Sequence, residues 1–244
     1  MSSQILPRWT QVLFRYFMIP CALWPVSLHV TSVSAQTSGV PYDSEGPRFH
    51  MTSSSYAYPS GFGSIHDVDF ENLKVTFWND KNGRPMLNQL KNGGWEIRFR
   101  NGAYDSICLR AVHSLRSADP GRQYALAVYE EDNAGGSSSQ DGIAQVFELA
   151  DERLTVMEQI DWDLHYGGPY GPLDDFDEKA NTFTVRSAHY QPGDGHCCVS
   201  WFDVVTYRWD GWGFNETSIQ TEPSNYGRPR HKASPPKPIP LHMP

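Results

Sequence analysis

The apolar residues of this chain recur mostly with a period of two, and this pattern constrains the fold more than any other feature. Phe183 and Val185 alternate with polar neighbours, and so do Val205, Tyr207 and Trp209. Because successive side chains of a strand point to opposite faces, such alternation is typical of half-buried β-strands. We therefore expect a mainly β domain of antiparallel strands, arranged as a meander or curled sheet with little helix. An α+β fold is the alternative.

Residues 124–129 break the alternation because they are continuously apolar. A run of this kind is expected of a central strand that is covered on both faces. Turn-forming pairs such as Asn92-Gly93, Asn101-Gly102 and Asp210-Gly211 separate the predicted strands. Residues 85–91 are predicted as a short helix. The remaining predicted strands are 73–78, 95–100, 107–112, 144–149 and 154–160.

The first 35 residues are predicted to be a cleavable signal peptide. They contain Arg8 and Arg15, no acidic residue, and an apolar stretch over 16–28. That stretch is about 13 residues long, whereas a membrane-spanning helix needs roughly 20. Cys21 invites comparison with a lipoprotein cleavage site, but the residues before it fit poorly. We expect a protein that does not span a membrane after signal cleavage.

The rest of the chain divides by composition into three parts. Residues 36–63 are rich in Ser, Gly, Pro and Tyr without periodicity, which predicts a flexible linker. Residues 64–220 carry the strand pattern and are expected to form one β-rich domain. Residues 221–244 are Pro-rich, and Pro cannot continue backbone hydrogen bonding, so we expect a disordered tail.

The chain is acidic, which bears on its partners. Its formal net charge is −8, and loss of Arg8 and Arg15 with the signal would make it −10. A negative body disfavours nucleic-acid binding. The predicted tail is a small basic exception on this acidic body.

Three cysteines remain after signal removal: Cys108, Cys197 and Cys198. Export would place them where thiols oxidise, so a disulfide from Cys108 to one member of the pair is the leading interpretation. A ring between the adjacent cysteines is the second. Soft metal ligation by the pair together with His189 and His196 is the third.

Acidic residues gather in two runs that flank a glycine-containing segment. Asp161 and Asp163 form the first, and an oxygen-rich setting of this kind suits calcium. However, neither run has the spacing of a recognised calcium loop, and acidic runs are commonly solvated surface. The second run consists of Asp174, Asp175, Asp177 and Glu178.

The same acidic residues could act in pairs on a glycosidic bond. Trp162, Tyr166 and Tyr170 lie nearby in the sequence and could stack on a sugar. Asp161, Asp163, Trp162 and Tyr166 are therefore the ligand-binding candidates. Ser64 is the nearest approach to a nucleophilic serine motif and lacks the full pattern.

The order of these features resembles a poorly characterised group of small exported bacterial proteins that includes the mycobacterial LppP/LprE-type lipoproteins. The resemblance is carried by 68–73, 91–94, 124–129, Cys197-Cys198 and 207–211. It implies export, a β-rich domain and the cysteine pair, and it supplies no catalytic residue. The group commonly has an acidic loop before the central strand, whereas residues 117–122 here lack those acidic ligands.

We therefore expect a secreted or periplasmic protein that is a non-catalytic envelope or extracellular binding or structural module. Its partner would be a cell-envelope polysaccharide or protein, and we predict no cofactor. A glycan hydrolase using paired carboxylates is one alternative. A redox or metal sensor using the adjacent cysteines is the other.

Overall fold

The computed structural model describes residues 47–52, 56–79, 85–133, 139–164, 175–191, 193–194 and 199–224. The chain divides into two compact units, Met1–Val40 and Pro41–Pro244, and every described residue belongs to the second. The predicted mainly β fold is confirmed, because antiparallel sheets dominate the described residues. No helix among them is long and apolar enough to cross a membrane.

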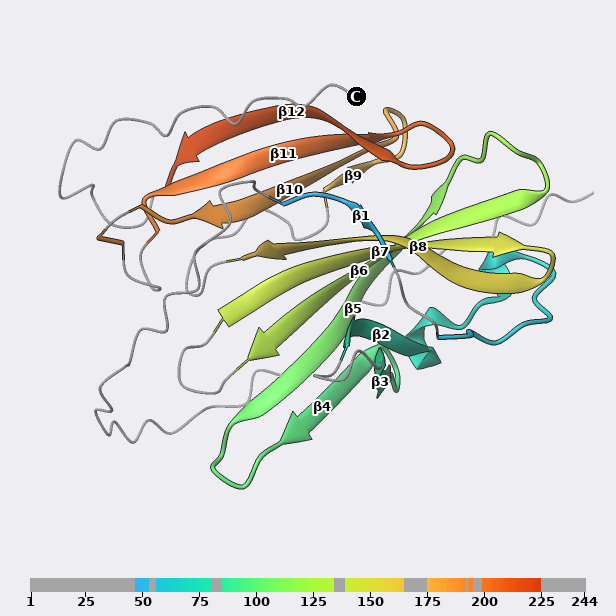
Figure 1. Ribbon diagram of the computed structural model, residues 1–244, viewed down its shortest axis with the longest axis horizontal. Helices are drawn as coiled ribbons and strands as arrows, with labels where there is room; N and C mark the ends of the chain where they lie inside the picture. The colour runs from blue at the N-terminus through green and yellow to red at the C-terminus, as the bar shows by residue number, and fades with distance from the viewer. Residues whose placement is uncertain are drawn as a thin grey trace, which may run out of the picture. The chain divides into compact units, whose positions relative to one another are not determined.

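Two antiparallel sheets and a hairpin make up the described part of this unit (Figure 1). The larger sheet has six strands, in the order β1 (His50–Met51), β8 (Arg153–Asp163), β7 (Ser139–Ala150), β6 (Arg122–Asn133), β5 (Tyr104–Leu115) and β4 (Gly94–Arg98). The smaller sheet has four, in the order β12 (Phe214–Pro223), β11 (Trp201–Trp209), β10 (Thr182–His189) and β9 (Phe176–Asp177). The hairpin consists of β2 (Lys74–Asn79) and β3 (Pro85–Gln89).

Apolar cores cover both faces of the six-stranded sheet. On one face, Leu126 and Val146 pack with Phe183 and Tyr207 of the smaller sheet, and we call this the intersheet core. On the other face, side chains of the sheet such as Phe147 pack with residues of the β2–β3 hairpin and of two short 3₁₀ helices. We call this the hairpin core, and the helices are η1 (Ile65–Asp67) and η2 (Phe70–Asn72).

The continuously apolar segment 124–129 lies in β6, and all six of its residues are buried. β6 is an interior strand between β5 and β7, as predicted. Alternate residues of the segment enter the two cores: Tyr129 belongs to the hairpin core, and Val128 belongs to the intersheet core. A strand that faces two cores needs apolar residues at every position, which explains the absence of alternation there.

The prediction of a short helix over 85–91 is wrong, because this segment forms β3 and pairs with β2. A short apolar run cannot be assigned from periodicity alone. Here Leu73 and Leu90 are both buried in the hairpin core, and the Leu90 N–H donates to the Leu73 carbonyl. Tertiary packing of the hairpin therefore decides its conformation. The Asn92-Gly93 turn is confirmed, with both residues at positive φ, as a tight two-residue turn requires.

Residues that precede Ile65 are part of the folded unit, although they fall in the expected linker 36–63. β1 pairs with β8, and the Phe49 ring stacks on Phe214 with ring centroids 4.5 Å apart. Tyr58 is buried in the hairpin core. At the other end, β12 continues to Pro223, beyond the start of the expected tail. In the Ser- and Gly-rich segment 36–63, the aromatic residues indicate this packing.

Candidate functional site

Acidic side chains from three neighbouring strands align at one end of the six-stranded sheet. Glu131 of β6 lies directly opposite Asp141 of β7, and Asp141 lies directly opposite Asp163 of β8. Directly opposed residues share a face, with Cβ atoms about 4.5–5.5 Å apart. Asp161, two residues before Asp163, has the same orientation by strand alternation. We call Glu131, Asp141, Asp161 and Asp163 the acidic line.

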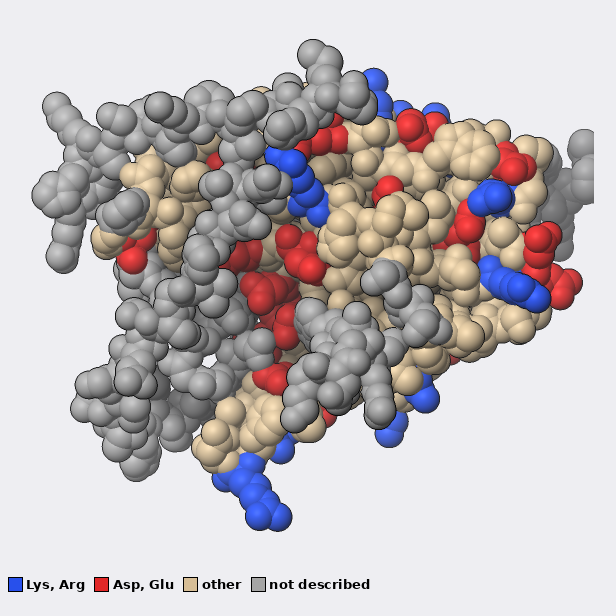
Figure 2. All heavy atoms as spheres, in the orientation of Figure 1, with Lys and Arg blue, Asp and Glu red and all other residues tan. Residues whose placement is uncertain are grey.

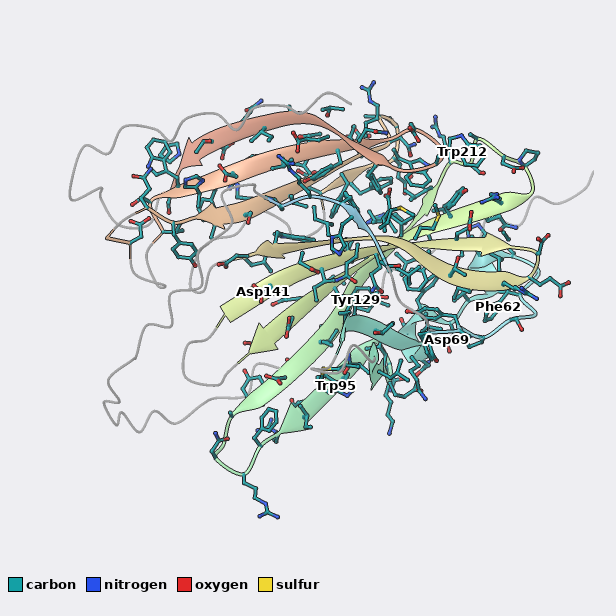
Figure 3. All side chains as sticks on the ribbon, viewed as in Figure 1. Phe62, Asp69, Trp95, Tyr129, Asp141 and Trp212 are labelled. Carbon is teal, nitrogen blue, oxygen red and sulfur yellow. The ribbon has the colours of Figure 1, made fainter. Side chains whose placement is uncertain are left out.

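The acidic line lies on the face that carries the hairpin core. Tyr129 and Ile143 are opposed on β6 and β7 and belong to that core. Glu131 and Asp141 each lie two residues from them, so alternation gives the same face. Figure 2 shows acidic side chains gathered in a hollow near the strand ends where Figure 3 labels Asp141. The packed core therefore gives way to carboxylates at this end of the sheet.

A chain of buried amides leads from the hairpin core to the acidic line. Gln145 Nε2 donates to the Thr76 carbonyl at 2.8 Å and to Gln159 Oε1 at 2.7 Å. Gln159 Nε2 in turn lies 2.9 Å from Asp161 Oδ1. Gln145 and Gln159 are only 1% and 4% exposed. Hydrogen bonds between buried groups fix the two strands that carry Asp141 and Asp161.

Buried polar atoms without a hydrogen-bond partner within the described part of the chain include Gln145 Oε1 and the hydroxyls of Tyr58 and Tyr129, all on this face. Figure 3 labels Tyr129 on β6. A buried polar atom without a partner costs about 1–3 kcal/mol.

The environment of Asp141 disfavours its charged form. Burial, followed by the charges of Asp163 and Asp161, raises the pKa of Asp141 to about 6. Burial also raises the pKa of Asp161, although this residue keeps more than a third of its surface exposed and the Gln159 hydrogen bond acts against the shift. Holding carboxylates together in this way costs stability, and such costs are concentrated at functional sites.

The structure separates the sequence-predicted acidic runs. Asp161 and Asp163 lie on the six-stranded sheet, whereas Asp177 lies on β9 of the smaller sheet. Backbone N–H groups of Ala180 and Lys179 donate to Asp177 and hold its pKa below the ordinary value. Asp177 is therefore a turn residue. Asp175 and Glu178 lie beside β9, and Asp174 lies outside the described residues.

Trp162 is only 4% exposed and belongs to the intersheet core. Its ring lies against Gly142 and makes an edge contact with Phe183, with ring centroids 5.8 Å apart. It therefore fills the core and does not offer a ring face to a sugar. Tyr166 and Tyr170 lie outside the described residues.

Asp141 and Glu131 were missed by sequence reasoning. Neither belongs to the two acidic runs, and they reach Asp163 only through the pairing register of β6, β7 and β8. Register is set by the tertiary fold. The available signal was the acidic residue Asp141, three residues before the predicted strand 144–149.

His189, a weak metal candidate, lies at the end of β10. Its Nδ1 is 2.7 Å from Oδ2 of the buried Asp203, and the Thr221 hydroxyl donates to Oδ1 of the same carboxylate. This contact orients the imidazole. Its predicted partners His196, Cys197 and Cys198 lie outside the described residues, and Cys108 lies on β5. The disulfide, ring and metal interpretations stay predictions.

Among the described residues, no group of three or more His, Cys, Asp and Glu side chains is arranged to hold a metal ion. No protein-family model, curated protein or solved structure matches the chain. The resemblance to the LppP/LprE-type lipoproteins therefore stays a prediction.

Proposed function

We propose that this protein is an exported, non-catalytic binding module that holds a positively charged segment of a partner protein on the acidic line. The observation that carries the proposal is Asp141, a partly buried carboxylate beside two others on rigid, paired strands. Export is supported by the charge and apolar pattern of the first 35 residues.

A cationic ligand suits this site because it would remove the electrostatic cost of the site. An opposite charge within about 4–6 Å favours the charged form of a carboxylate. A Lys or Arg side chain would therefore lower the pKa of Asp141 on binding and relieve its repulsion from Asp163. A neutral polysaccharide would supply no such compensation.

The scaffold is suited to recognition without large movement. β6 and β7 are interior strands that are paired on both sides, and the Gln145–Gln159 amide chain joins β7 to β8 beneath the carboxylates. Sites built on paired strands hold their geometry better than sites built on loops. The carboxylates are therefore preorganised for a ligand.

The test is binding of a labelled hexa-arginine peptide, measured by fluorescence anisotropy at low salt and pH 7.5. We expect the double variant Asp141→Asn, Asp163→Asn to bind at least about tenfold more weakly than the wild type. The matched control is Glu130→Gln, Asp132→Asn, which removes the same charge from the other face of the sheet. Equal weakening by both double variants would show attraction to net charge only and would overturn the proposal.

Glycan hydrolysis is the second candidate function, and one observation favours it. A carboxyl group with a pKa near 6 can act as a general acid, and Asp163 is its direct cross-strand neighbour. The Cβ atoms of such an opposed pair are about 4.5–5.5 Å apart, and the retaining mechanism uses two carboxyl groups about 5–5.5 Å apart. Release of reducing sugar by the wild type and its loss in Asp141→Asn would favour this function over the binding module.

A further inference from the structure

The line of opposed residues that contains the acidic line continues across β5 to β4. Glu131 lies opposite Ile107, and Ile107 lies opposite Trp95. Two residues further along β4, Ile97 lies opposite Asp105. These residues share the hairpin-core face, because Ile107 belongs to that core and Trp95 packs against it. The same face is thus acidic over β6 to β8 and apolar at β4.

The apolar end of this face is open to solvent. Ile97 is 41% exposed and Phe99, two residues later, is 46% exposed. Trp95, two residues before Ile97 on the same face, is half-buried, and Figure 3 labels it on β4. On the opposite face of β4, the Arg98 and Glu96 side chains pair with each other. We call Ile97 and Phe99 the apolar end.

Spacing connects the apolar end with the acidic line. Three strand intervals separate β4 from β7, which corresponds to about 14 Å, and two residues along a strand add about 7 Å. Asp141 and Ile97 are therefore about 16 Å apart along the sheet surface. An extended peptide advances about 3.3 Å per residue, so about five residues span this distance.

We propose that the apolar end is a specificity subsite for an aromatic or aliphatic side chain of the ligand. Resting on the proposed function, this inference defines the ligand as an extended protein segment with a basic residue and an apolar residue about five positions apart. Charge complementarity selects the segment, and apolar burial at Ile97 and Phe99 selects among basic segments. A second copy of this chain and a polysaccharide are the competing occupants.

The experiment compares three labelled peptides of equal charge with the complete protein. The first carries two arginines and a Phe five positions away, the second has Ser in place of Phe, and the third has Phe adjacent to the arginines. We expect the first to bind roughly tenfold more tightly than the other two, since burial of an aromatic side chain supplies an effect of this size.

The double variant Ile97→Ser, Phe99→Ser should remove this preference and leave binding of the Ser peptide unchanged. The matched control is Trp212→Ser, because Trp212 is 48% exposed and contacts the Arg122 guanidinium elsewhere on the surface. Circular dichroism melting verifies that both variants fold. Exposed positions are chosen so that the variants keep their cores.

Equal binding of the three peptides would overturn the subsite and leave the proposed function standing. Weak binding of every peptide would overturn both. Dissociation of a dimer by Ile97→Ser, Phe99→Ser in sedimentation experiments would assign the apolar end to a second copy. Retention of the wild type on a polysaccharide that is lost in this double variant would assign it to a glycan, and each of these two results overturns the peptide subsite.

Discussion

At the same strand ends, acidic side chains have different neighbours on the two faces of the six-stranded sheet. On the intersheet-core side, Arg110 of β5 pairs with Glu130, and the Tyr104 hydroxyl donates to Asp132 at 3.0 Å. On the hairpin-core side, Asp141 is flanked by Asp163 and Asp161, and its pKa rises to about 6. One face therefore neutralises its carboxylates with donors from the adjacent strand, whereas the other concentrates them.

This difference separates structural charge from charge available for recognition. A carboxylate that accepts from a neighbouring strand stabilises the pairing of the two strands. A carboxylate beside other carboxylates weakens the folded state and gains from an external cation. Asp132 and Glu131 are adjacent in the sequence, but their side chains point to opposite faces of the sheet.

The largest expected effect on stability is at Gly142, on the intersheet-core face of the sheet and thus opposite the acidic line. A Cβ atom at Gly142 would lie 2.1 Å from the Trp162 ring, so Gly142→Ala should lower the free energy of unfolding by about 3 kcal/mol. Urea denaturation monitored by circular dichroism measures this loss. Gly63→Ala is the control, since its Cβ would meet only an Asp67 oxygen at 3.6 Å and should change stability by less than about 0.5 kcal/mol. Equal losses of unfolding free energy in the two variants would show that the Trp162 ring moves aside without cost.

On the acidic line, removing the charge of Asp141 is expected to raise the free energy of unfolding, by less than Gly142→Ala lowers it. The folded pKa of Asp141, about 6, is above its ordinary value of 3.8, so this residue favours folding below pH 4 and loses that contribution as pH rises towards 6. Asp141→Asn should therefore stabilise the protein at pH 7.5, by about 1–2 kcal/mol after allowance for partial exposure. The difference from the wild type should shrink towards pH 4.

Urea denaturation from pH 4 to 7.5 makes this comparison, and the variant-minus-wild-type difference cancels the opposite contributions of Asp177, Asp194 and Asp210, whose pKa values are lowered. Asp132→Asn is the control on the other face and should destabilise by up to about 1 kcal/mol. Stabilisation by both variants would mean that the two faces do not differ.

The smallest effect is expected for the ion pair on the intersheet-core side. The Arg110 and Glu130 side chains are 35% and 20% exposed, so their pairing is partly screened by solvent. Arg110→Met should destabilise by less than about 1 kcal/mol, and added salt should reduce the difference. Thermal unfolding at two salt concentrations tests this. A loss that grows with salt would exclude an electrostatic origin.

The strands were predictable where one physical cause dominated the sequence. Residues 124–129 lie between two cores and are apolar throughout, and β10 and β11 alternate because one face packs against the larger sheet. The β2–β3 hairpin was not predictable in full, because the conformation of 85–91 depends on where Leu90 is buried. Local pattern identifies a strand, whereas partner identity requires the tertiary fold.

The candidate site was predictable only in part. Asp161 and Asp163 attract attention as a charged pair, but Trp162 between them faces the opposite core, and Asp141 joins them from another strand. The exposed position of Ile97 depends on what the tertiary fold packs against β4. No window of sequence contains that information.

The short strand β1 has a consequence for protection of the sheet edge. It covers β8 with only two residue pairs, His50 with Gln159 and Met51 with Glu158, and the Thr52 N–H continues the contact by donating to the Met157 carbonyl. A bare strand edge is a template for pairing with other chains. The segment around residue 50 therefore protects the edge of β8 from pairing with other chains. A truncated chain that lacks this segment would expose β8 and aggregate more readily.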